Sequence, residues 1–396
     1  MLKTLILALI IIIGLAMPGG SLLAQTPEDE DMFADLPEEG DLPFDDHGQE
    51  LYMEEDPDYE EHYYRARVLN VDETKVDEQE YFTTVEQEIL VELTSGPFAG
   101  KEISILNIFF EGDPVYDFIL EEGQEVIVVT LGPEGDFERA HVQDLARDRG
   151  VYYLLGVFAL VLLLVGRLKG LKTLVTLAVT IFLVFQFLLP LLLLGYSPIP
   201  LAVVMASLAI TFTLFVIGGL NMKSLVATLG TISGVIVAGL MAFWAGSISS
   251  LTGFGTHEAQ MLYFLDQNID FRGLLFAGII IGSLGAITDI GMSVASAAAE
   301  IRQADPDITD RELFKRSLNV GQDIMGTMAN TLIMAYVGAA TPMLLLVMGY
   351  EMDWLKIINM DIIATEFVRG AAGSIGLITA VPITAFLAGR LMVRRH

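Results

Sequence analysis

The sequence has no cysteine, few histidines and no basic tract. The absence of cysteine from all 396 residues excludes disulfides, thiolate zinc sites, a cysteine nucleophile and a lipoprotein anchor. The five histidines lie outside the apolar runs, so we predict no metal site and no cofactor. Lysine and arginine number 22 against 51 acidic residues and form no basic tract. This excludes nucleic acid as a partner, because phosphate neutralisation needs clustered cations.

Acidic charge and apolar character occupy different parts of the chain. Hydrophobic residues make up 53% of it, which is high for so acidic a sequence. Residues 1–150 contain 8 basic and 37 acidic side chains, whereas residues 151–396 contain 14 of each. The sequence therefore predicts two chemically different bodies that join near Gly150.

The amino terminus has the pattern of an export signal. Lys3 precedes an uncharged stretch from Thr4 to Ala16, and small residues follow as far as Ala24. This pattern predicts a signal peptide over residues 1–24. The alternative is an uncleaved anchor, but a span needs about 20 apolar residues and this run is shorter. In either case the chain from residue 25 onward is expected outside the cytoplasm.

An acidic segment follows over residues 25–62. Positions 27–61 hold 17 Asp or Glu and no Lys or Arg, so like charges repel and little apolar surface is available for burial. We predict a solvated, disordered tether. The alternative is a segment that binds divalent cations or a cationic partner, but it lacks the spacing of a calcium loop.

Residues 63–145 have the pattern of a small β domain. Turn-rich segments separate five β-branched or alternating runs, at 63–71, 85–94, 101–106, 125–131 and 138–145. Such spacing predicts a small extracytoplasmic barrel of the oligonucleotide/oligosaccharide-binding (OB) type, which serves as a spacer or binds a protein partner. The segment Gly96–Lys101 is one residue short of a phosphate loop and precedes Glu102 instead of Ser or Thr. It therefore predicts a hairpin turn.

Residues 150–396 predict an α-helical multi-pass domain with seven transmembrane helices, for which the lipid bilayer is the partner. Spans are expected at about 150–168, 173–194, 201–222, 224–246, 273–299, 324–348 and 370–389. Turn-forming residues at Gly195–Pro200 divide the second span from the third. With the β domain outside, seven crossings leave the carboxyl terminus in the cytoplasm. The flanks then carry eleven Lys or Arg inside against six outside, in agreement with the positive-inside rule.

Asp289 is an ionisable residue inside span five. It lies about 16 Å from the Glu300 end of the helix, at roughly 1.5 Å per residue, and hence near mid-membrane. An unpaired carboxylate there costs several kcal/mol, so it must be protonated, paired or hydrated. Ser293 falls on the same helical face.

Span six carries a matching polar face. Its polar residues project to one side: Asn319, Asp323, Thr327 and Asn330. Leu332 and Tyr336 point to other faces. A capping box at Thr309–Glu312 predicts that the helix begins near Asp310. Because the two helices are consecutive and antiparallel, we expect Asp289 to lie against Asn330 or Asp323. These residues would then line a hydrated route or form a hydrogen-bonded polar cluster.

Polar residues inside a membrane domain either join helices or line a route. Ser293 and Thr327 taken alone favour the first role, since hydroxyls commonly hydrogen-bond neighbouring helices at about 0.6 kcal/mol per contact. Carboxylates are costly as structural contacts, so Asp289, Asp323 and Asn330 together favour an ion or substrate route.

Span four has a packing signature. Gly230, Gly234 and Ala238 recur every four positions, which places them on one helical face. Small side chains at this spacing allow helix backbones to approach closely. They predict a packing face, used within the chain or between two copies.

Two long strings in spans five and six are distinctive. They are AITDIGMSVAS at Ala286–Ser296 and NVGQDIMGTMANTL at Asn319–Leu332. Together with Ser95–Lys101 and Arg272–Gly278, they make the sequence similar to the YibE/F-like family of bacterial multi-pass membrane proteins over roughly residues 63–392. The resemblance implies a protein of the bacterial inner membrane and no settled activity.

These observations predict a permease for a small solute or ion, with its route between spans five and six. The alternative is a non-catalytic envelope scaffold whose β domain binds a partner while the helices anchor it. A third reading, an intramembrane aspartyl protease, requires Asp289 and Asp323 to share a proton. It is disfavoured because Ala286-Ile287-Thr288 stands where similar proteases have Gly-x-Gly. We therefore predict no enzymatic activity.

Overall fold

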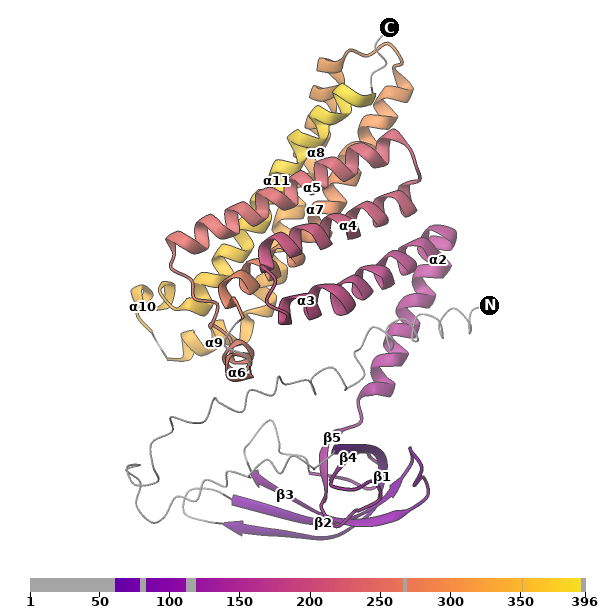
Figure 1. Ribbon diagram of the computed structural model, residues 1–396, viewed down its shortest axis with the longest axis vertical. Helices are drawn as coiled ribbons and strands as arrows, with labels where there is room; N and C mark the ends of the chain where they lie inside the picture. Colours follow the sequence, from indigo (N-terminus) through magenta and orange to yellow (C-terminus); the bar gives the residue numbers. More distant parts are fainter. Residues whose placement is uncertain (1–60, 79–82, 112–118, 266–268, 351, 393–396) are drawn as a thin grey trace. The chain divides into compact units, whose positions relative to one another are not determined.

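The protein is described by a computed structural model over residues 61–78, 83–111, 119–265, 269–350 and 352–392. These residues form two compact units that divide between Phe158 and Ala159 (Figure 1). The predicted signal peptide and the acidic segment as far as residue 60 lie outside the described residues.

The first unit contains one antiparallel sheet. Its strands are β1 (Glu61–Glu78), β2 (Thr83–Leu93), β3 (Glu102–Glu111), β4 (Glu125–Leu131) and β5 (Ala140–Leu145). Their order is β3-β2-β1-β4-β5, and the two edge strands, β3 and β5, approach one another, so the sheet curls into a half-barrel (Figure 1). All five predicted strands are present, but β1 is longer than predicted. Irregularities in its pairing between Val68 and Asn70 and between Val71 and Glu73 bend it, and it pairs with both β2 and β4.

Alternating side chains fill the concave side of this sheet. Ala66, Ile89, Val91 and Val126 are among the fully buried residues. The predicted hairpin turn after β2 is present: the Leu93 amide donates to the Lys101 carbonyl at 2.9 Å. This turn needs Gly96 and Gly100, whose φ angles are +78° and +88°.

An ion-pair network fixes the sheet to the helix that follows it. Glu125 of β4 pairs with Arg65 and Arg67 of β1, each at 3.4 Å, and with Arg149. Arg65 also pairs with Asp148, where the helix α2 begins. The first turn of α2 is thus held to β1 and β4 by charge-assisted contacts.

The second unit is helical. It contains the part of α2 (Asp148–Leu183) from Ala159 onward. Its other elements are the π-helix η1 (Val184–Leu188), α3 (Leu189–Leu193), α4 (Pro198–Gly218), α5 (Met222–Ile248), α6 (His257–Leu265), α7 (Phe271–Ala304), α8 (Asp310–Ala339), α9 (Thr341–Gly349), α10 (Trp354–Ile358) and α11 (Asp361–Met392). Among the described residues, five helices are long and apolar enough to cross a membrane, or six if the bent pair α8–α9 is one span. The number seven remains a prediction.

The difference in number arises from the first two predicted spans. They form one helical run of 46 residues, Asp148–Leu193, which is interrupted at Arg167 by the non-helical angles φ 48° and ψ −125°. The chain bends so sharply there that a Cβ on Gly170 would collide with the Leu162 carbonyl oxygen. Only glycine fits at that position.

The sixth predicted span also differs from the structure. We expected one helix over 324–348, whereas α8 ends at Ala339 and α9 continues at an angle of 59°. Pro342 in the first turn of α9 explains the break, because proline lacks the amide hydrogen that a continuous helix would use.

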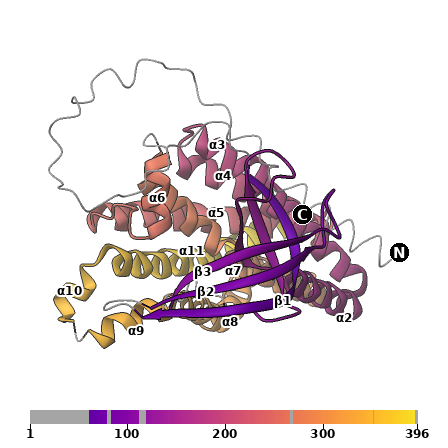
Figure 2. The same cartoon turned by 90° about the horizontal axis from the view of Figure 1, so that it is seen from below.

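Four helices enclose the core of this unit: α5, α7, α8 and α11. The helix α11 lies between α5 and α8 (Figure 2), and α4 packs on α5 and α7. Val235, Ile287, Val294, Leu377 and Val381 are fully buried at the centre. Pairwise packing of the four helices therefore decides which face of α7 and of α8 turns outward.

Candidate functional site

Side-chain caps define where the two helices of the predicted site begin. Asp270 caps α7 by accepting a hydrogen bond from the Gly273 amide at 2.8 Å. Thr309 caps α8 by accepting one from the Glu312 amide at 3.3 Å, as the capping-box pattern predicts.

Two close contacts fix the register between α7 and α8. A Cβ on Gly282 would lie 2.9 Å from the Tyr336 hydroxyl, and one on Gly321 would lie 3.0 Å from Val294 Cγ2. Since the helices are antiparallel, Asp289 lies at the level of residues 326–329 of α8. Asp323 and Asn330 are then about one turn to either side of that level.

The predicted site residues share one outward-facing surface, which we call the polar face. It consists of Asp289 and Ser293 of α7 with Asn319, Asp323, Thr327 and Asn330 of α8. Ser293 is half-buried and the other five are exposed. The Thr327 hydroxyl donates to the Ile324 carbonyl at 2.8 Å, within its own helix.

The expected contact of Asp289 with Asn330 or Asp323 is not formed. Within the described part of the chain, no hydrogen bond or ion pair joins any of these three side chains to another residue. The reason is the rotation of α8, which buries Leu313, Ser317, Gly321 and Leu332 against its neighbours. The carboxylates and amides on the opposite side therefore point outward instead of toward α7.

Glycines leave the polar face uncovered. An added Cβ at Gly285 of α7 or at Gly326 of α8 would meet no atom within 4 Å. Both residues are exposed; Gly326 lies at the level of Asp289, and Gly285 lies about one turn from it. The polar face is therefore an open surface and not an internal channel.

A second polar group, which the sequence analysis missed, lies where α7, α8 and α11 meet. It consists of Tyr336, Glu366 and Arg369, and we call it the Tyr336 cluster. Arg369 Nη1 is 2.8 Å from Glu366 Oε1, and the guanidinium carbon is 5.9 Å from the Tyr336 ring centre. The two charged side chains are only 27% and 24% exposed.

The Tyr336 cluster retains unused hydrogen-bonding capacity. The Tyr336 hydroxyl, Glu366 Oε2 and Arg369 Nε are buried and have no hydrogen-bond partner among the described residues. Glu366 and Arg369 are three residues apart on a helix that begins at Asp361. The predicted span begins only at residue 370, which leaves both residues in a loop. Extending the helical pattern backward from Gly370 would have revealed the pair.

The small residues of α5 face the interior of the same unit. A Cβ on Gly230 would collide with Thr384 Oγ1, and one on Gly234 would lie 2.8 Å from Ala380 Cβ. Ala238 is fully buried, and a Cβ on Gly376 would lie 2.5 Å from the Ala238 Cβ. These residues bring α5 and α11 together within one chain.

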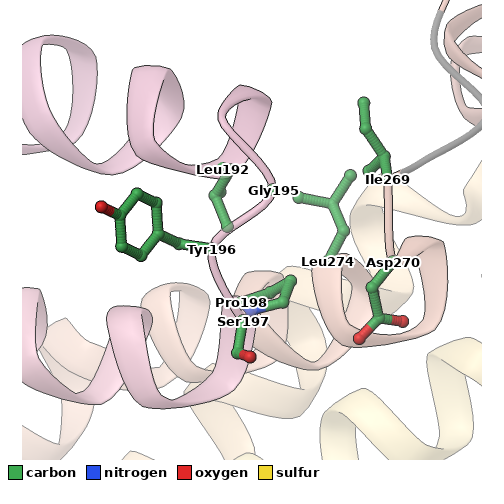
Figure 3. Close-up of a pocket in the computed structure, with 8 residues that line it drawn as sticks. All are labelled: Leu192, Gly195, Tyr196, Ser197, Pro198, Ile269, Asp270 and Leu274. Carbon is green, nitrogen blue, oxygen red and sulfur yellow. The ribbon is translucent and has the colours of Figure 1, made fainter.

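A small recess lies away from the predicted site residues (Figure 3). It has a volume of about 90 Å³ and lies between the α3–α4 turn and the start of α7. Its charged residue, Asp270, already caps α7, and the Tyr196 ring points away from it (Figure 3). The described residues contain no cluster of three or more His, Asp or Glu that would hold a metal.

The long apolar helices define the class of this protein, which is a multi-pass helical membrane protein. Within that class the chain belongs to the YibE/F-like family, because the model of that family, described as YibE/F-like protein, matches residues 154–394. No curated protein and no solved structure matches the chain. The match covers the helical unit with both helices of the polar face, and the β sheet precedes it.

Proposed function

We propose that this protein is a permease for a small ion or solute in the bacterial inner membrane, and that the polar face forms its route. The observation that carries the proposal is the joint exposure of Asp289 and Asp323 on the adjacent helices α7 and α8. Intramembrane carboxylates of this kind mark ion pathways and proton relays. Their negative charge favours a cation, and the amides of Asn319 and Asn330 add oxygen ligands along the same line.

The proposed topology has seven spans. A single crossing by a run of 46 residues would be about 69 Å long, more than twice the roughly 30 Å of hydrocarbon. We therefore assign the bend at Arg167 to a cytoplasmic turn between two spans. The β domain, whose strand order fits an OB-type barrel opened between β3 and β5, is then extracytoplasmic and the carboxyl terminus cytoplasmic.

Flux measurements in proteoliposomes test the permease. Purified protein is reconstituted, and the entry of H⁺, Na⁺ and K⁺ is followed with trapped dyes under an imposed membrane potential. We expect flux of at least one of these ions above that of empty vesicles. Asp289→Asn should lower it by about tenfold or more, because it removes the charge that attracts the cation.

A matched variant separates the site from general charge effects. Glu300→Gln neutralises an exposed carboxylate at the end of the same helix and should leave the flux unchanged. Folding of every variant is checked by its elution profile and thermal melt. If well-folded Asp289→Asn protein conducts as the unsubstituted protein does, or if none of the three ions crosses, the cation route is wrong.

The ion-pair network around Glu125 favours a second candidate function. It links the β strands to the first turn of α2 through ion pairs. Such a link is expected of an envelope scaffold in which a membrane helix carries a partner-binding domain. In that case removal of residues 63–145 abolishes the cellular role, while Asp289→Asn matters only through stability. Measuring both variants in the same cells distinguishes the two functions.

A further inference from the structure

Lipid acyl chains alone are an unfavourable environment for the polar face. Exposed apolar residues such as Ile333, Met334 and Val337 continue α8 beyond Asn330, so this part of the helix lies in hydrocarbon. A carboxylate that faces acyl chains costs several kcal/mol, and an amide without a partner adds to that cost. Asp289, Asp323 and the neighbouring amides therefore require water or a second polar surface beside them.

Other segments of the same chain are poorly suited to cover this face. The first arm of α2 exposes apolar side chains, including Leu154, Val161, Leu164 and Val165, and offers few donors. Residues 27–61 carry 17 acidic side chains and no basic ones, so they would repel Asp289 and Asp323.

We propose that a second copy of this chain covers the polar face, and that the cation route is complete only in the dimer. The face is self-complementary, because it combines carboxylate acceptors with the amide donors of Asn319 and Asn330. Two copies with the same topology are related by a two-fold axis along the membrane normal, which brings equal depths together. The Asn330 amide of each copy then lies about one turn from the Asp289 carboxylate of the other.

The dimer gives the carboxylates a function that the single chain does not. Two copies of Asp289 near a common axis repel one another unless a proton or a cation lies between them. Two further copies of Asp323 lie about one turn along the same axis. This inference rests on the proposed permease function and adds that a second copy of the chain encloses the route.

The absence of cysteine from the sequence permits a direct test by cross-linking in native membranes. Single cysteines are introduced at Gly326, which meets nothing within 4 Å, and at Met334, which is 54% exposed. Gly326 lies at the level of Asp289, and Met334 lies about one turn beyond Asn330. The control is Leu240→Cys, an exposed position on α5 outside the polar face and near the level of Met334, since the neighbouring Gly239 meets Ile280 of α7.

After mild oxidation, Gly326→Cys and Met334→Cys should give disulfide-linked dimers at least about fivefold more often than Leu240→Cys, as an isologous interface requires. Equal yields at the three positions would overturn the inference. A monomeric mass for the detergent-solubilised protein, together with complete labelling of the Gly326→Cys variant by a membrane-impermeant maleimide, would overturn it as well.

The flux assay separates failure of this inference from failure of the proposed function. Flux that depends on Asp289 without cross-linking across the polar face means that the route closes within one chain. In that case the dimer is wrong and the permease stands. Cross-linked dimers that conduct none of the three ions mean that the interface is real and the permease is wrong.

Discussion

The α5–α11 side and the α7–α8 side of the helical unit use the same residue types in opposite ways. Between α5 and α11, glycines face backbone and small side chains, and a Cβ on Gly376 would lie 2.5 Å from Ala238 Cβ. On the α7–α8 side, Gly285 and Gly326 meet nothing within 4 Å, and Asp289 is exposed beside them. A small residue joins helices only where a second helix is present to meet it.

This contrast assigns different roles to the two sides. The closed side holds the unit together through close backbone packing. The open side contributes little to the stability of one chain, since the polar face makes no hydrogen bond or ion pair with other described side chains beyond those within a helix. Substitutions should therefore separate stability from function according to the side on which they fall.

The largest expected effect is on the closed side. Gly376→Ala introduces a Cβ that collides with Ala238 and lies 2.7 Å from the Gly234 carbonyl oxygen, so α5 and α11 must move apart. We expect a loss of about 1–3 kcal/mol in the free energy of unfolding. Gly285→Ala on the open side is the matched control and should be neutral or stabilise by up to about 1 kcal/mol. Unfolding in mixed micelles measures both, and equal melting temperatures would contradict the contrast.

Next in size is the Tyr336 cluster, which lies between the two sides. Arg369→Gln leaves Glu366 without its cation in a half-buried position, and we expect a loss of about 2 kcal/mol, below the figure for a fully buried pair. Glu366→Gln should cost a similar amount. The double variant should lose less than the sum of the two single losses, because no charge is then left unpaired. Strictly additive losses in the same micelles would show that the pair contributes no coupling.

A third prediction compares an enclosed carboxylate with an open one. Glu125→Gln removes the partner of three arginines, and we expect the β domain to lose on the order of 1–2 kcal/mol. Asp289→Asn should leave the stability of the detergent-solubilised protein unchanged or raise it, because its carboxylate has no stabilising partner among the described residues. Asp144→Asn, whose ion pair with Arg147 is exposed, serves as the neutral control. Urea titration of the three variants tests the order.

The smallest effect concerns a buried hydroxyl of the β domain. Burial raises the pKa of Tyr64 above its ordinary value of 10.0, and the charge of Glu134 acts in the same direction. The folded state therefore favours the neutral Tyr64 hydroxyl more strongly than the unfolded state does. This contribution to the free energy of unfolding is fully present below pH 10 and is lost as the pH rises through the folded pKa. Tyr64→Phe should therefore flatten the alkaline part of the stability curve and change stability at pH 7 by less than about 1 kcal/mol. Circular dichroism of the full chain between about pH 9 and 12 compares the two proteins.

Local features of this protein were predictable from the sequence alone. The glycines at positions 96 and 100, the box at Thr309–Glu312 and the turn at Gly195–Pro200 act over a few residues, and the structure contains the turn, the cap and the break. The polar character of one face of α8 follows equally from helical spacing. These features depend on backbone angles and hydrogen bonds that neighbouring residues decide.

Other features were decided only by the tertiary structure. The Tyr336 cluster joins α8 to α11, and the direction in which Asp289 and Asn330 point depends on which sides of α7 and α8 pack against their neighbours. Helical periodicity defines the faces of a helix but does not state which neighbour each face will meet. That choice follows from the packing of four helices at once, where Gly321 and Leu332 fit the interior and the carboxylates do not.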